Sequence, residues 1–138
     1  MQKIKLNLEP NDRITFVSDV AIPTPDGKAL KVSFDFRHRT REQMAKLLDT
    51  YLAKAREVAA DAAAKVEDDE GTTLLADNVA ELIARDVEAV MDVASGWYVE
   101  DHPYSAASLS KFFNLYPGAA TAIVQHYRVS LLQGRLGN

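Results

Sequence analysis

Three histidines are the side chains in this sequence best able to carry acid–base or metal chemistry: His38, His102 and His126. No two of them stand at the short spacing from which a helix or loop presents paired metal ligands. Only His102 has acidic neighbours, Glu100 and Asp101, so this segment is either a weak cation site or a solvated acidic turn. Because a metal ion needs several ligands in a defined geometry, we favour the turn and predict neither a metal site nor a cofactor.

A second acidic segment, Glu67 to Gly71, superficially resembles a calcium-binding loop. It lacks the alternating oxygen ligands and the terminal glutamate spacing of an EF-hand loop. We therefore interpret it as a solvated connection between two helices.

Basic residues cluster from Arg37 to Arg41, in the sequence RHRTR. If a helix begins here, its N-terminus could attract a phosphate or a carboxylate of a partner protein. The alternative, which we favour, is a charged exit from a strand in which alternate side chains face water.

Nucleophilic catalysis has no visible motif in this chain. Serine, histidine and carboxylate residues are all present, but the sequence has no nucleophile elbow, phosphate loop or paired-carboxylate motif. We predict that the protein is not an enzyme. An enzyme that uses His102 or His126 is the most distant alternative.

The size and composition are those of an ordinary globular protein. With 138 residues, 47% of them apolar and 26% charged, the chain can bury a real core. We expect a single domain over residues 1–138, with a β-hairpin region at 1–39 and a helical region at 40–138. There is no cysteine, no signal-peptide core at the N-terminus and no apolar run long enough to span a membrane.

The formal net charge of −4 is unevenly distributed along the chain. Residues 103–138 hold three basic residues and no acidic one, so the rest of the chain carries −7. This acidity argues against nonspecific nucleic-acid binding, which relies on Lys and Arg at the phosphates. A helix-turn-helix around Pro117 is also disfavoured, because the following residues, GAATA, offer almost nothing that reads base edges. We predict no nucleic-acid partner and no membrane partner.

Apolar residues alternate along two segments, Ile14–Ile22 and Leu30–Arg37. Between them lies the cluster PTPDGK, in which Gly27 can adopt a positive φ. This pattern predicts an antiparallel β-hairpin with one apolar face, which the helices downstream must cover because a lone hairpin is marginal in water. The residues predicted on that face are Ile14, Phe16, Val20, Ile22, Leu30, Val32, Phe34 and Phe36.

Four later segments show the three-and-four spacing of amphipathic helices. Thr40 and Gln43 fit a capping box, Gly96 stops the second helix and Ser105 caps the third. Pro117 ends the third helix and suits the first turn of the fourth. The first helix becomes alanine-rich, which permits close approach of another helix. We predict an α+β fold, an N-terminal antiparallel β-hairpin packed on a bundle of about four α-helices. The predicted helices run from Thr40 to Val66, from Thr73 or Asp77 to Ala94, from Ser105 to Tyr116 and from Pro117 to Leu132.

The segment Gly96–Asn138 holds the only tryptophan and four of the five tyrosines. Aromatic residues at helical spacing usually belong to a core, but Trp and Tyr are also favoured in interfaces. We expect some of them, together with the basic residues of this acid-free segment, to meet a partner. The candidate partner-binding residues are Trp97, Tyr98, Lys111, Tyr116, Arg128 and Arg135.

The same segment resembles the tail assembly chaperones of long-tailed bacteriophages and prophages. The likeness rests on Gly96-Trp97, on the run from Leu109 to Ala120 with its FFNLYPGAA, and on the closing GRLGN. Upstream, the hairpin with its Pro/Gly turn and the helix start from Phe34 to Glu42 are also similar. The resemblance covers most of the chain, and Tyr116 to Ala119 is its most specific part.

The resemblance implies a non-enzymatic protein that acts in the cytoplasm of the bacterial host during tail morphogenesis. Such chaperones coat the long helical tape measure protein, keep it soluble and give way as tail tube subunits assemble on it. The implied partners are therefore the tape measure protein and the tail tube protein, and a homo-oligomer is compatible with this role. The alternative is a structural head–tail or tail-completion protein, which would stay in the virion.

Overall fold

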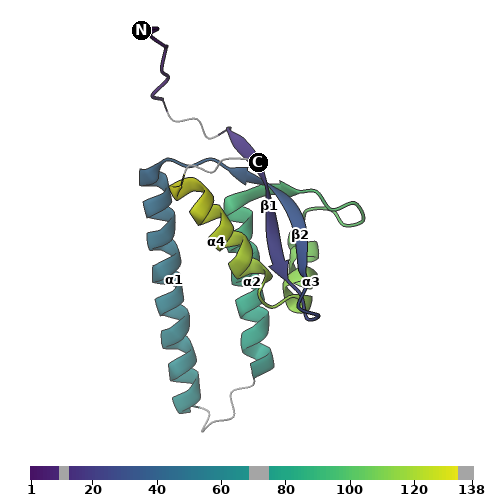
Figure 1. Ribbon diagram of the computed structural model, residues 1–138. Helices are drawn as coiled ribbons and strands as arrows, with labels where there is room; N and C mark the ends of the chain where they lie inside the picture. Colours follow the sequence, from purple (N-terminus) through teal and green to yellow (C-terminus); the bar gives the residue numbers. More distant parts are fainter. Residues whose placement is uncertain (10–12, 69–74, 134–138) are drawn as a thin grey trace.

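The computed structural model describes residues 1–9, 13–68 and 75–133 (Figure 1). In this part of the chain, a three-stranded antiparallel sheet in the order β1-β2-β3 packs on four helices. The predicted α+β fold, a β-hairpin on a helical bundle, is confirmed. The elements are β1 (Thr15–Pro23), β2 (Ala29–Arg37), α1 (Arg41–Asp68), α2 (Leu75–Val93), β3 (Ala94–Trp97), α3 (Ala106–Leu115) and α4 (Ala119–Leu132).

The hairpin has a regular register over all nine residues of each strand. In its turn, Gly27 has a φ of 83°, a backbone conformation that glycine adopts without steric cost. The Gly27 N–H donates to the Thr24 carbonyl at 3.1 Å. The predicted apolar face is buried except at its ends, where Ile14 and Leu30 are 48% and 40% exposed. The alternation therefore identified the correct face of both strands.

The third strand corrects the prediction for the end of the second helix. The predicted helix includes Ala94 and stops at Gly96, but α2 ends at Val93 and the chain passes directly into β3. β3 pairs antiparallel with β2, and the Tyr104 hydroxyl donates to the Ala94 carbonyl at 2.8 Å. Four residues are too few to show an alternation of their own, and β3 forms because β2 offers an unpaired edge beside the end of α2.

The helix starts follow the predicted capping chemistry in two cases. The Thr40 N–H donates to Gln43 Oε1 at 2.9 Å and the Gln43 N–H to Thr40 Oγ1 at 3.1 Å, a reciprocal capping box. The Ser105 hydroxyl accepts from the Ser108 N–H at 3.1 Å and caps α3. These local hydrogen bonds satisfy amide groups that the first turn of a helix leaves unpaired.

Pro117 separates α3 from α4, as predicted, but it does not lie in the first turn of α4. That helix begins at Ala119, with Gly118 as its N-cap residue, and Pro117 belongs to the preceding turn. A Cβ atom on Gly118 would lie 3.3 Å from Cγ of Pro23, at the end of β1. Glycine thus lets this turn approach the hairpin closely.

Aromatic contacts between the sheet and α4 form the centre of the core. The Tyr127 ring, fully buried, lies 5.5 Å from the ring of Phe36 and 6.3 Å from that of Phe16. Its hydroxyl donates to the Arg37 carbonyl at 2.7 Å and accepts from Arg39 Nη1 at 2.9 Å, so its polar atom is satisfied. The larger buried side chains are Phe16, Val20, Ile22, Val32, Phe34, Phe36, Met44, Val87, Val90, Val93, Leu109, Phe113, Ile123 and Tyr127.

His126 is a half-buried part of the contact between α4 and β1. Its Nε2 lies 2.7 Å from Oγ of the buried Ser18, and its ring stacks on Phe36 at 5.9 Å. Burial lowers the pKa of His126, and the charge of Asp19 opposes this shift. The neutral imidazole is therefore the form that fits the folded protein.

Acidification is expected to destabilise the fold through His126. The unfolded chain has the higher histidine pKa, about 6.5, so it takes up the proton first. The contribution of His126 to stability is complete above about pH 6.5 and is lost as the pH falls through the lower folded pKa. Urea unfolding measures this effect. Between neutral pH and about pH 5, the free energy of unfolding should fall less for His126→Gln than for the parent protein. Equal losses in the two proteins would contradict this assignment.

Candidate partner-binding surfaces

Helix α1 leaves the core after its first three turns. Met44 is buried and Leu47 and Leu48 pack against the core, but Leu52 is 56% exposed. Figure 1 shows α1 and α2 continuing together beyond the sheet and the other helices. On α2, Val79 remains 43% exposed. The far part of this helix pair therefore carries apolar side chains that no element of the described chain covers.

A groove of about 430 Å³ lies between the two helices, and we call it the helical groove. Three alanines and one leucine supply its apolar surface, and Leu82 is 49% exposed there. Small side chains on facing helices leave room for the backbone of a third helix to approach. The lining residues are Tyr51, Lys54, Ala55 and Ala59 from α1, and Leu82, Arg85, Asp86, Glu88 and Ala89 from α2.

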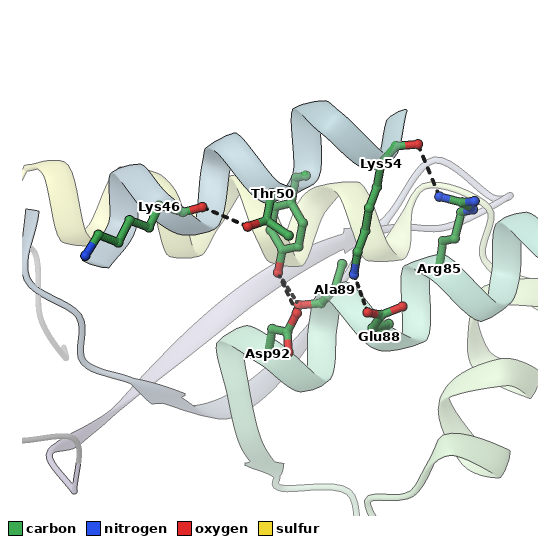
Figure 2. A network of polar contacts seen from close by, with 8 residues as sticks. Lys46, Thr50, Lys54, Arg85, Glu88, Ala89 and Asp92 are labelled. Atoms are coloured by element: carbon green, nitrogen blue, oxygen red, sulfur yellow. Dashed lines mark hydrogen bonds and ion pairs between the residues drawn. The ribbon is translucent and has the colours of Figure 1, made fainter. Parts of the chain in front are cut away.

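Polar contacts join the two walls of the helical groove (Figure 2). The Tyr51 hydroxyl donates to the Ala89 carbonyl at 3.1 Å, and burial raises its pKa, with the nearby Asp92 carboxylate adding to the shift. Arg85 Nη1 donates to the Lys54 carbonyl at 3.2 Å. Lys54 also forms an exposed ion pair with Glu88, and this bond lowers the pKa of that carboxyl.

Asp86 is the charged group of the helical groove that the described residues leave without a partner. It is half-buried, burial raises its pKa, and no hydrogen bond or ion pair to it is found in the described chain. A carboxylate that has lost part of its hydration is stabilised by a nearby cation. The groove is therefore suited to an apolar segment that carries Lys or Arg.

A second groove of about 430 Å³ lies between β2, β3 and α3, and we call it the aromatic groove. The Trp97 ring lies 5.7 Å from that of Tyr104 and 5.8 Å from that of Phe112, and its Nε1–H donates to the His102 carbonyl at 3.0 Å. The lining residues are Leu30, Val32, Trp97, Val99, Asp101, His102, Ser108, Lys111, Phe112, Leu115 and Tyr116.

The aromatic groove brings together three of the six residues predicted to bind a partner: Trp97, Lys111 and Tyr116. Tyr98 lies outside it, 59% exposed, and donates its hydroxyl to Asp35 Oδ1 at 2.9 Å. Arg128 is exposed on α4 and does not line this groove. Arg135 lies outside the described residues.

The basic segment that could have bound a phosphate contributes to the fold. Arg39 donates to the hydroxyl of Tyr127 and its guanidinium carbon lies 5.9 Å from the centre of that ring. Arg37 and Arg41 are exposed. This arrangement is that of a charged strand exit with one arginine turned inward to the core.

Residues 1–9, 13–68 and 75–133 contain neither a cluster of metal ligands nor a long apolar helix. No group of three His, Asp or Glu side chains in these ranges converges as metal ligands do. Nε2 of His102 lies 3.6 Å from Oδ2 of Asp101, and both side chains are largely exposed. None of the helices in these ranges is long and apolar enough to cross a membrane. Of the acidic segment Glu67 to Gly71, the last three residues lie outside the described ranges.

The comparison with known families decides what class of protein this is. A family model described as phage tail assembly chaperone matches residues 1–138, the whole sequence. The chain belongs to the phage tail assembly chaperone family. No match was found among curated proteins or among solved structures. The resemblance inferred from the run that contains Tyr116 to Ala119 is confirmed.

Membership of this family implies that the partners of the chaperone are phage tail proteins, and it indicates a non-catalytic protein. The sequence interpretation did not include the helical groove among the candidate binding surfaces. A signal was present, because the apolar stripe of the first helix continues past Leu52 into the alanines at 55 and 59. Periodicity shows which face of a helix is apolar, but it does not show whether that face is covered.

Proposed function

We propose that this tail assembly chaperone binds the tape measure protein in the host cytoplasm and receives one of its amphipathic helices in the helical groove. The observation that carries the proposal is the uncovered apolar surface between α1 and α2, with Ala55, Ala59 and Leu82 along it. A tape measure protein exposes long apolar helical stripes before tube subunits surround it. Masking such a stripe in a groove is the helix-in-groove mode of recognition.

The walls of the helical groove support this mode in two ways. Alanine side chains on α1 and α2 allow a third helix to reach the interaxial distance of about 8–10 Å that packed helices adopt. Asp86 offers a carboxylate for a Lys or Arg on the entering helix. The exposed Lys54–Glu88 ion pair crosses the groove and must open or move when a helix enters. Its loss should cost little, because solvent-exposed ion pairs contribute little to stability.

Release of the chaperone follows from modest affinity at each site. Many copies bound along one tape measure protein would together keep it soluble. Each copy would dissociate quickly enough for tail tube subunits to take its place. The aromatic groove, with Lys111 at its rim, is a second surface available to the tape measure protein or to the tube protein. In this proposal, Trp97 and Tyr116 anchor that second contact.

Co-expression tests the proposed function directly. The tape measure protein should gain soluble yield when the chaperone is present, and the two should co-purify, because its apolar stripes are masked. Purified partners that fail to associate at any salt concentration would refute the proposal. Mass spectrometry of mature particles tests the alternative: a chaperone is absent from them, whereas a head–tail or tail-completion protein is present in stoichiometric amount.

A further inference from the structure

The N-terminal arm, residues 1–9, has the pattern of a β-strand but no partner in the described chain. Its apolar side chains Ile4, Leu6 and Leu8 alternate with Lys5 and other polar residues, which places them on one face of an extended chain. These three side chains are 83%, 72% and 81% exposed. Figure 1 shows the arm extending away from the folded body. Three large aliphatic side chains on one face of a nine-residue segment thus lie in water.

The backbone of the arm is equally unsatisfied by protein groups. The hydrogen bond described within residues 1–9 runs from the Glu9 N–H to Asn7 Oδ1 at 3.0 Å, and none is described from the arm to the body. An extended segment with free N–H and C=O groups and an apolar face is a strand ready to join a sheet.

The same chain offers a matching edge. β1 pairs with β2 on one side, and no strand of the described chain pairs with its other side. This free edge runs for nine residues, whereas the opposite edge of the sheet, β3, has only four. The outer face of β1 also leaves Val17 42% exposed. A long free edge is a template for an added strand.

We propose that the arm of one chaperone molecule adds as a strand to the free edge of β1 in a second copy. Both the arm and the edge lack partners within the described chain, and joining them satisfies both backbones and removes Ile4, Leu6 and Leu8 from water. Copies linked in this way would bind a tape measure protein with greater avidity, a consequence that rests on the proposed function.

Sedimentation equilibrium of the full-length chaperone, without any tape measure protein, tests whether the arm of one copy binds β1 of another. Leu6→Lys should raise the dissociation constant between copies by about tenfold or more, because it removes one large aliphatic side chain from the new contact. Asn7→Lys adds the same charge on the opposite face of the arm and should leave the constant within about threefold. Both variants should keep the thermal stability of the monomer, since all nine residues of the arm are exposed. Equal effects of the two substitutions, or a parent protein that is monomeric at all concentrations, would overturn the proposal.

Cross-linking identifies the edge, and the absence of cysteine from the chain makes introduced thiols unique. A mixture of Asn7→Cys and Val17→Cys chains, treated with a short bifunctional thiol reagent, should yield cross-linked pairs of the two variants. Ser95→Cys on β3, exposed on the opposite edge, is the matched control and should yield few. A chain that carries both Asn7→Cys and Val17→Cys tests the alternative within one molecule. If it cross-links only within itself, the arm pairs with its own β1, and the proposed pairing between copies is refuted.

Discussion

Two glutamates placed in the helical groove, Ala55→Glu with Ala59→Glu, are expected to abolish binding of the tape measure protein while the chaperone stays folded. Both alanines line the groove and are exposed in the free protein. Each substitution should therefore cost only a few tenths of a kcal/mol of helix propensity. In the complex, the carboxylates would be pressed against an apolar helix face, and affinity should fall on the order of a hundredfold, or about 3 kcal/mol. Co-purification from co-expressing cells and titration with a tape measure fragment measure the loss.

The same helix supplies a matched control. Ala53→Glu with Ala60→Glu adds two glutamates to exposed positions of α1 that do not line the helical groove. The two double variants have the same net charge and similar helix propensity, so they differ in the face that is altered. The control should bind like the parent protein. If both pairs weaken binding equally, charge alone is responsible and the groove is not the site.

Phe36→Ala is expected to produce the largest loss of stability, about 3–5 kcal/mol, by leaving a cavity in the centre of the core. Phe36 is fully buried, and its ring lies 5.5 Å from those of Phe16 and Tyr127 and 5.7 Å from that of Phe34. Since small proteins have about 5–15 kcal/mol of stability in total, this variant should be marginally folded. Urea unfolding followed by far-ultraviolet circular dichroism gives the difference in free energy.

Val17→Ala on the other face of the sheet is the control for the core substitution. Val17 is 42% exposed, so its truncation should change the unfolding free energy by about 0.5 kcal/mol or less in the free monomer. A small effect of Phe36→Ala, comparable to that of Val17→Ala, would show that the aromatic contacts between the sheet and α4 do not hold the fold together.

Local chemistry made the hairpin and most helix starts predictable. The alternation from Phe16 to Ile22 favours one register, because a shift by one residue would turn Phe16, Val20 and Ile22 toward water. Gly27 and the Thr40–Gln43 capping box likewise act within a few residues of chain. The resemblance, of which Tyr116 to Ala119 is the most specific part, predicted the family, and the match over residues 1–138 confirms it.

Long-range contacts decided what local patterns left open. β3 forms because the end of α2 places Ala94–Trp97 beside the free edge of β2. A strand of four residues is too short to show an alternation that would predict it. The aromatic groove gathers Trp97, Lys111 and Tyr116 but excludes Arg128, because α3 lies beside that sheet edge and Arg128 projects from α4. Residues that share a segment of sequence thus end on different surfaces.

The order of residues specifies which side chains are apolar, with what period, and where the chain must turn, and from these follow the α+β class and the faces of its strands and helices. The folded arrangement specifies which of those faces remain uncovered: the far part of the α1–α2 pair, the arm and the free edge of β1. This division arises because periodicity is a local property, whereas coverage depends on how many elements compete for one core. In this chaperone that core is filled by the sheet and the packed parts of the helices, while other apolar side chains, such as Leu52 and Leu82, remain exposed.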